Sequence, residues 1–353
     1  MKNRKEIYYW KCDRPSASKS NKIPIDINQI YELISDDLDL KNLNITPFEG
    51  QGNHITYIID AKTEHFFLRI ENGSEGDIYM DREAQVLADL KSIGIPVPSV
   101  IAVDASRKKY PFSFQVLEFI NFKDLNTLYK LKEFPLESLA FNIGQYIALW
   151  QAVEPAGFGL FDPKLDPLTG LHSTYSQYFL KNFDKHVSFL QQSNFLENEI
   201  VGEIYDLVQE YGALLELDHG VLVHKDLAFW NILGTETKIH SFIDWDDVIS
   251  GDPTDDISLL ACFHKGSIIH EVIKGFNSVR PLPIDFELRF WLHLLRNMIV
   301  KAVIRVRDGF FNRTDDLFLI PKGMSGEMFR EFTKERIKIA CLGLKKKIKI
   351  LDL

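Results

Sequence analysis

At 353 residues, with 45% hydrophobic and 12% aromatic content, the chain can bury a large core in one big domain or two smaller ones. Its net charge of −9 argues against nucleic acid as the main partner, because nucleic-acid binding requires a basic face. No apolar run is long enough for a signal-peptide core or a membrane span, so we expect a cytoplasmic protein without a membrane partner.

The N-terminal third of the chain favours strands. After a variable lead-in at residues 1–25, to which we assign no chemistry, Ile27–Leu40 has the apolar spacing of a helix. A second helix is predicted over Ile78–Ile93. Strands are predicted at Ile45–Glu49, His54–Asp60, His65–Glu71 and Phe112–Ile120.

The turn between the first two strands is rich in glycine. Gly50 and Gly52 free the backbone N–H groups around Asn53 to approach phosphate oxygens. Glycine-rich hairpins are usually only turns, so this pattern by itself leaves both interpretations open. On the third strand a single cation, Arg69, lies among apolar residues and could either reach a cleft or be an exposed strand charge.

The rest of the chain is predicted to be mainly helical. Helical spacing marks Leu136–Val153, Asn194–Leu217, Phe286–Arg307 and Phe329–Ile350. The second of these is acidic, which indicates either a solvated face or a rim that recruits substrate, and the basic residues near the ends of the last two suit helix C-termini. Three widely separated cysteines predict reduced, buried thiols, namely Cys12, Cys262 and Cys341.

The strongest signal is the stretch Val221–Asp256, in which short apolar runs alternate with polar residues. Its polar members are His224, Asp226, Asn231, Asp244 and Asp256. One Asp that orients a hydroxyl nucleophile, followed by an Asn and a second Asp that hold magnesium ions, is the arrangement of phosphoryl-transfer sites of the protein-kinase type. The spacing His-x-Asp-x-x-x-x-Asn matches the kinase catalytic loop residue for residue.

Departures from protein kinases indicate another branch of the same fold. Lys225 replaces the usual Arg, Trp245-Asp246 replaces Phe-Gly, and Asp252-Pro253 follows Asp244 too closely for a long activation loop. With Ile-Asp-Trp and Gly-Asp-Pro-x-x-Asp, the stretch resembles the aminoglycoside phosphotransferase and choline kinase superfamily. The resemblance covers roughly residues 45–260.

This resemblance implies a fold and a division of the chain. The expected fold class is α+β, a bilobal protein-kinase-like fold with a small N-terminal antiparallel sheet and a larger, mainly helical C-terminal lobe. The N-terminal nucleotide-binding lobe would span residues 1–120 and the C-terminal catalytic and substrate-binding lobe residues 121–353.

The resemblance also implies roles for the motif residues. Asp226 would orient the acceptor hydroxyl and take its proton late, while Asn231 and Asp244 would hold Mg²⁺. His224 is expected to brace the loop, and Asp256 to accept backbone hydrogen bonds from it.

On the nucleotide side, the resemblance implies that Arg69 replaces a phosphate-binding Lys and pairs with Glu83, for which Asp81 is the rival. The other residues expected at ATP are Gly50, Gly52 and Asn53 at the phosphates and Glu118 and Ile120 at the adenine edge.

The acceptor is expected to be a small molecule with a hydroxyl group. Asp246, Asp247 and the acidic helix favour an amine-bearing alcohol or amino sugar, because carboxylates can bind amines. A neutral polyol held by aromatic residues is the alternative, the candidates being Tyr175, Tyr178 and Phe183. A choline, ethanolamine or sugar kinase, or a weakly active nucleotide-binding pseudokinase, also stays open.

Overall fold

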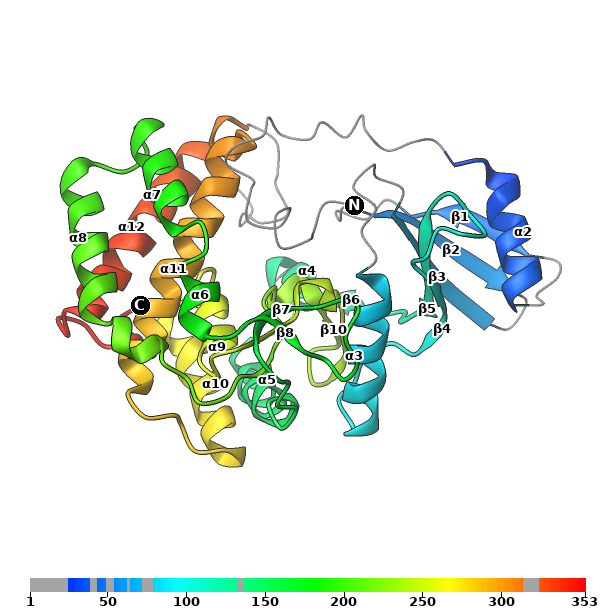
Figure 1. The fold of residues 1–353 in the computed structure, drawn as a ribbon, viewed down its shortest axis with the longest axis horizontal. Helices are drawn as coiled ribbons and strands as arrows, with labels where there is room; N and C mark the ends of the chain where they lie inside the picture. Colours follow the sequence, from blue (N-terminus) through cyan, green and yellow to red (C-terminus); the bar gives the residue numbers. More distant parts are fainter. Residues whose placement is uncertain are drawn as a thin grey trace.

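The computed structural model describes residues 25–38, 43–48, 54–61, 64–71, 79–131, 136–313 and 324–353. A small antiparallel sheet lies at one end of the molecule and a larger, mainly helical body at the other (Figure 1). This is the α+β bilobal arrangement that the sequence predicts. Gly50, Gly52 and Asn53 lie outside the described residues.

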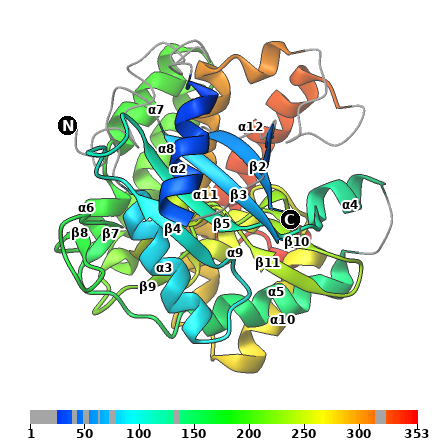
Figure 2. The same cartoon turned by 90° about the vertical axis from the view of Figure 1, so that its right-hand side faces the viewer.

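The N-terminal sheet has five antiparallel strands in the order β1-β2-β3-β5-β4. Figure 2 shows the helix α2 (Ile27–Leu38) lying across one face of this sheet. The helix contributes Ile30, Leu33 and Ile34 to a compact apolar cluster with strand residues such as Leu68. The strands are β1 Asn44–Pro47, β2 Ile55–Ala61, β3 Glu64–Glu71, β4 Val100–Asp104 and β5 Ser113–Glu118.

The helix α3 (Met80–Ser92) stands between the sheet and the helical body (Figure 1). Its buried Val86, Leu87 and Leu90 belong to the large core of the C-terminal part and not to the cluster under α2. The Tyr79 hydroxyl, just before the helix, donates to the Val248 carbonyl at 3.0 Å. Helix α3 therefore packs with the larger body, although it lies within the N-terminal third of the sequence.

The C-terminal part packs two small sheets among helices, with strand orders β11-β10-β6 and β8-β7-β12-β9. We propose to keep 1–120 and 121–353 as the two lobes, since β6 already pairs with β10. The elements are β6 Lys123–Asp124, α4 Leu125–Leu131, α5 Glu137–Trp150, β7 Phe158–Phe161, β8 Gly170–His172, α6 Tyr175–Phe179, α7 Phe183–Gln192, α8 Asn198–Glu210, η3 Gly212–Leu215, β9 Val221–Val223, η4 Phe229–Asn231, β10 Ile232–Gly234, β11 Ile239–Phe242, η5 Trp245–Asp247, β12 Ile249–Gly251, α9 Asp255–Leu260, α10 Gly266–Val279, α11 Phe286–Arg307, η6 Phe310–Asn312, α12 Gly326–Leu344 and η7 Ile350–Asp352.

Helices α5 and α10 cross with their backbones in contact. A Cβ atom added at Gly144 would meet the Val272 carbonyl, and one added at Gly275 would meet the Phe141 carbonyl. Only glycine, which has no Cβ atom, allows the two helix backbones to approach this closely.

Helix α3 lies within the predicted Ile78–Ile93 and α5 within the predicted Leu136–Val153, while two further helices depart more from their predicted ends. The acidic helix predicted over Asn194–Leu217 is the shorter α8, followed by the separate turn η3. The last helix, predicted over Phe329–Ile350, is α12, which starts earlier because the Ser325 hydroxyl accepts the Met328 N–H at 3.2 Å and caps it. It ends before Lys346, whose φ of 57° breaks the helix.

Cys262 and Cys341 are buried free thiols, as expected, whereas Cys12 lies outside the described residues. Of the helices in the described part of the chain, none is both long and apolar enough to cross a lipid bilayer.

Candidate functional site

The loop after β9 carries the central polar motif, and Asp256 fixes its shape. Lys225 has a φ of 67°, which turns the chain sharply between His224 and Asp226. The Asp256 carboxylate accepts the backbone N–H groups of His224 at 3.0 Å and Lys225 at 3.1 Å, and the indole N–H of Trp150 at 3.3 Å. The hydrogen bonds expected of Asp256 are therefore present.

His224 connects this loop to the segment that follows β11. Its ring is fully buried, with Nε2 3.1 Å from the Ile243 carbonyl and Nδ1 3.3 Å from the Asp226 backbone nitrogen. Burial lowers the pKa of His224 to about 4, so the ring is neutral near pH 7. A neutral ring donates through Nε2 and accepts at Nδ1, which suits the bracing role expected of it.

Asp226 and Asn231 are joined across the turn of the loop. The Asn231 side-chain amide donates to the Asp226 backbone carbonyl at 2.9 Å and to its carboxylate Oδ2 at 3.2 Å. The Asp226 side chain is 30% exposed, so it can be reached from solvent. The amide nitrogen of Asn231 is thus committed to Asp226, and its oxygen remains as a hard ligand.

Asp244 lies at the junction of the two lobes in a left-handed conformation, with φ 66° and ψ 59°. Its side chain is 41% exposed. Desolvation and then the charge of Asp246 raise the pKa of Asp244 well above 3.8, with Glu83 and Asp226 adding to the effect and Arg69 opposing it. The site therefore crowds several carboxylates together, and a cation between them would relieve that repulsion.

Arg69 and Glu83 form a buried ion pair between β3 and α3. The guanidinium Nη1 donates to Glu83 Oε1 at 2.7 Å and Oε2 at 2.8 Å, and the residues are 6% and 1% exposed. Glu83 also accepts the Trp245 backbone N–H at 3.1 Å. The pair predicted from the sequence is present, and Glu83 is the partner instead of Asp81.

The other end of the Arg69 guanidinium points toward the carboxylates that follow β11. Its Nη2 lies 3.3 Å from Asp244 Oδ1, 3.1 Å from His54 Nδ1 and 3.8 Å from Asp246 Oδ2. Burial would lower the pKa of Arg69, but Glu83, Asp244 and Asp246 outweigh it and keep the guanidinium charged. A single Arg therefore links the N-terminal sheet, helix α3 and the carboxylates after β11.

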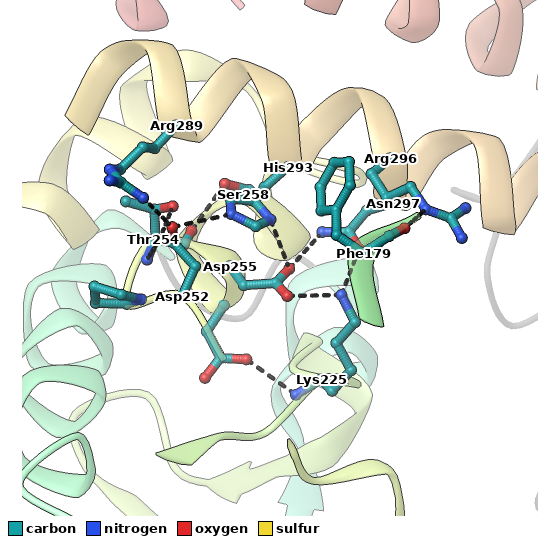
Figure 3. A network of polar contacts seen from close by, with 12 residues as sticks. Phe179, Lys225, Asp252, Thr254, Asp255, Ser258, Arg289, His293, Arg296 and Asn297 are labelled. Atoms are coloured by element: carbon teal, nitrogen blue, oxygen red, sulfur yellow. Dashed lines mark hydrogen bonds and ion pairs between the residues drawn. The ribbon is translucent and has the colours of Figure 1, made fainter. Parts of the chain in front are cut away.

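Lys225 is held by helix α11, as Figure 3 shows. Its Nζ donates to Asp255 Oδ2 at 2.7 Å and to Asn297 Oδ1 at 2.9 Å, while the Asn297 amide donates to Asp255 Oδ1 at 2.9 Å. The residue that stands in place of the kinase Arg therefore anchors the loop and is neutralised by a fully buried carboxylate.

The residues expected at the adenine edge have these contacts. The Glu118 carboxylate accepts the Ser99 N–H and hydroxyl at 3.1 and 2.7 Å, which leaves the expectation for its backbone in β5 untouched. Ile120 follows that strand, and its carbonyl accepts the Phe122 N–H at 2.9 Å. Asp246 faces Arg69 on the nucleotide side of the cleft and not the acceptor side of Asp226.

The alternative acceptor pocket of aromatic residues is wrong for a packing reason. Tyr175, Tyr178 and Phe183 are each at most 4% exposed and belong to the large apolar core. The Tyr175 hydroxyl lies 3.5 Å from Asp255 Oδ2, within the polar network of α9 and α11. Their side chains therefore support the fold and do not form an open wall.

The sequence interpretation missed Lys301. This residue of α11 places its Nζ 3.8 Å from Asp226 Oδ1 and 4.8 Å from the centre of the Phe263 ring. Its spacing of four residues from Arg305 put both cations on one helix face, which was the available signal. Only the packing of α11 showed that this face meets the catalytic loop.

Known proteins share this fold. Residues 44–271 match the model of the phosphotransferase enzyme family, whereas no curated protein matches the chain. The aminoglycoside phosphotransferase APH(4)-Ia gives a TM-score of 0.62 at 16% identity, over 90% of this chain and 99% of that one. A Thermobifida fusca protein provisionally assigned as a fructosamine-3-kinase gives 0.63 at 15% identity, over 91% and 100%. Because the family match spans more than half of its length, the chain belongs to the phosphotransferase enzyme family.

Proposed function

We propose that this protein transfers the γ-phosphate of ATP to a hydroxyl group of a small molecule. The observation that carries the proposal is the position of Arg69, which bonds Glu83 and also reaches Asp244 at 3.3 Å. A buried cation thus lies next to the carboxylates of the catalytic motif, which supports a role for it in binding the nucleotide phosphates. The similar APH(4)-Ia occurs in complexes with hygromycin B and either ADP or AMP-PNP, which supports a nucleotide together with a small molecule.

The residues present fit a magnesium ion. Asp244 and the Asn231 side-chain oxygen are hard ligands, and magnesium prefers a few such ligands completed by phosphate oxygens and water. Bound there, the ion would neutralise charge on the nucleotide phosphates.

The role we assign to Asp226 is to orient the acceptor hydroxyl and to receive its proton late in the transfer. Phosphoryl transfer depends mainly on positioning and electrostatic stabilisation, so this carboxylate need not be a strong base. Asn231 holds its Oδ2 at 3.2 Å, which leaves Oδ1 as the oxygen directed at the acceptor.

For the nucleotide, we assign Arg69 to the phosphates, with Glu83 holding its guanidinium in place. The backbones of Glu118 and Ile120 are assigned to the adenine edge. We assign the turn with Gly50, Gly52 and Asn53 to the nucleotide phosphates, which its backbone N–H groups would contact. A pseudokinase is less consistent with these contacts, because Asp226, Asn231 and Asp244 are brought together with Arg69.

The preference for an amine-bearing acceptor loses two of the acidic features on which it depended. Asp246 lies beside Arg69. The acidic helix α8 lies at the outer end of the helical body (Figure 1), where Glu203 pairs with Lys345 at 2.6 Å. Asp247, the third acidic feature behind that preference, lies next to Asp246 in η5 and is partly exposed, so the amine-bearing acceptor stays a prediction that rests on Asp247.

The test is Asp226→Asn in a screen of ATP consumption across hydroxylated compounds. We expect kcat to fall by about 10²–10⁴-fold, because proton acceptance and hydroxyl orientation are both lost. Affinity for Mg·ADP, measured by titration calorimetry, should change little, since Asp226 is assigned to the acceptor.

The matched control is Asp206→Asn, which removes an exposed carboxylate from α8 and should leave kcat unchanged. An Asp226→Asn protein that keeps more than about a tenth of its kcat, a loss of only ~1.4 kcal/mol, would contradict the role of Asp226. Wild-type protein that transfers phosphate to no hydroxylated compound would contradict the proposed function itself.

A further inference from the structure

We propose that the acceptor carries an anionic group, a carboxylate or a phosphate ester, which Lys301 binds next to the reacting hydroxyl and which the buried charge of Arg305 attracts. This inference rests on the proposed function and names the chemical class of its substrate. The inference starts from the groups around Asp226 Oδ1, the oxygen nearest to Lys301.

The two oxygens of the Asp226 carboxylate face different groups. Asn231 bonds Oδ2 at 3.2 Å on the nucleotide side, whereas Lys301 lies 3.8 Å from Oδ1. The Lys301 side chain is 17% exposed and that of Asp226 is 30% exposed, so solvent reaches both groups. An acceptor hydroxyl at Oδ1 would therefore bring the rest of the molecule within reach of Lys301.

Arg305 lies one helical turn further along α11 and is a buried cation. It is 2% exposed, and its Nη1 donates to the Thr333 hydroxyl at 2.8 Å. Its guanidinium also lies over the rings of Phe329, at 4.2 Å, and Phe263, at 5.9 Å. Within the described part of the chain, the structure pairs Arg305 with no carboxylate. Burial lowers the pKa of Arg305 to about 10, because a buried charge without a countercharge is less stable than one in water.

Several cations gather near Cys262, although the chain as a whole is acidic. Burial raises the pKa of the Cys262 thiol, and the charges of Lys301, Arg305, Arg336 and Lys225 are all near enough to oppose that rise. Arg336 donates to the His264 carbonyl at 3.3 Å, a neutral partner. Lys301 already faces Asp226 and Arg336 is within range of the Glu335 charge, so an anion bound here would chiefly supply the countercharge of Arg305.

Aromatic residues form the floor of the same region. Lys301 lies over Phe263, and Phe263 meets the Trp230 ring edge to face with centroids 4.7 Å apart. Trp230 belongs to the catalytic loop, and both rings are partly exposed. A compact acceptor could thus contact the rings with its carbon skeleton while Asp226 holds its hydroxyl and the cations hold its anionic group. A cationic amine at that place would be repelled by Lys301.

A narrower role for Lys301 would be to contact only the phosphoryl group in transfer. In that case the charge of the acceptor would not matter, and loss of Lys301 would lower kcat equally for all acceptors. A role in binding the acceptor anion instead raises KM for anionic acceptors selectively.

The experiment compares acceptors that share a skeleton but differ in charge. The series are glucose, glucosamine, gluconate and glucose 6-phosphate, and glycerol, glycerate and glycerol 3-phosphate. We expect wild-type kcat/KM to be at least tenfold higher for the best anionic member than for its neutral or cationic counterpart. KM of that acceptor should rise with ionic strength, because salt screens the attraction.

The variant Lys301→Met keeps the unbranched side chain and removes the charge. It should raise KM for the anionic acceptor at least tenfold and change KM for a neutral acceptor little. Arg305→Lys, which keeps the charge, should retain most of the preference even if Arg305→Met fails to fold. The matched control, Lys338→Met on the exposed face of α12, should behave as wild type.

The outcomes separate the two proposals. If wild-type protein phosphorylates a neutral or cationic member best in every series, or if Lys301→Met lowers kcat alike for all acceptors with unchanged KM, only the anionic acceptor is refuted. If wild-type protein phosphorylates no compound of either series or of the wider screen, the proposed function fails and this inference fails with it.

Discussion

At the scale of single residues, the choice of Arg at position 69 has consequences for both stability and binding. A guanidinium presents donors on two edges, and here Nη1 serves Glu83 while Nη2 reaches Asp244. A Lys ammonium on the same strand is a more compact charge and cannot hold the same planar bridge. Arg69 therefore joins the two lobes in a way that a Lys would reproduce only in part.

Substitution of Arg69 tests this bridge. Arg69→Ala leaves Glu83 buried without its partner, so we expect a loss of about 3–5 kcal/mol in the free energy of unfolding. The affinity for Mg·ADP should fall as well, and Arg69→Lys should retain part of it. Chemical denaturation and titration calorimetry measure the two effects.

A paired substitution separates stability from binding. Arg69→Met combined with Glu83→Leu removes both charges and should recover much of the lost stability, because no unpaired ion is left in the core. Nucleotide affinity should stay low in this double variant. Recovery of affinity together with stability would show that Arg69 acts only through the fold.

At the scale of elements, helix α11 clamps the segment that leads into α9. Arg289 and His293 contact Asp252 at 2.6 and 3.4 Å (Figure 3), and Thr254 donates to it from its backbone and its hydroxyl. Burial would raise the pKa of Asp252, but His293 and Arg289 outweigh it and hold the pKa well below 3.8. Asp255 is lowered in the same way, with Lys225 and His293 overcoming its burial.

These lowered pKa values predict how stability changes in acid. The unfolded chain takes up protons near pH 3.8 while the folded Asp252 stays ionised, so the stabilisation is complete above that pH and is lost as the pH falls through the folded pKa. Urea unfolding of Asp252→Asn should therefore show a lower midpoint than wild type at pH 7. The difference should shrink as the pH falls below about 4.

The exposed Asp206→Asn on α8 is the control, because its midpoint should follow wild type at every pH. Parallel curves for Asp252→Asn and wild type down to pH 3 would show that the contacts of Asp252 do not depend on its charge. His224 and Asp256 are present in both proteins, so comparison at each pH isolates Asp252.

At the scale of the whole molecule, the protein has two separate apolar cores, a small one in the N-terminal sheet and a large one in the C-terminal part. The cluster under α2 joins the helix to the N-terminal sheet, whereas α3 packs with the large core of the C-terminal part. Cooperative opening follows such packing units more closely than it follows the sequence. We therefore expect the sheet with α2 to open first and α3 to stay with the helical body.

Native-state hydrogen exchange in mild denaturant tests this expectation. Amides of β2 and β3 should exchange at lower denaturant than amides of α3, α5 and α11. Leu33→Ala should speed exchange in the sheet alone, by a cavity cost of roughly 2–5 kcal/mol. Exchange of α3 together with the sheet would show that the two cores open as one unit, and added Mg·ADP should slow opening of the sheet.

Local sequence determined much of this protein because its central motif is contiguous. His224, Asp226, Asn231, Asp244 and Asp256 lie on short strands and turns within three dozen residues, so their spacing indicated the family, and the resemblance implied the backbone hydrogen bonds of Asp256. The pair of Arg69 with Glu83 could also be predicted, because the resemblance implies that the cation of the third strand pairs with a Glu on the next helix.

The surroundings of the motif depended on tertiary packing. Acidity along the chain suggested an amine-binding site, yet Asp246 turns to Arg69 and α8 lies at the outer end. Lys301 lies far along the chain from Asp226, and its spacing from Arg305 indicated only a shared helix face, not what that face meets. Spacing in sequence reports contacts within one loop or helix, whereas the approach of α11 to the catalytic loop is decided by how their apolar faces pack.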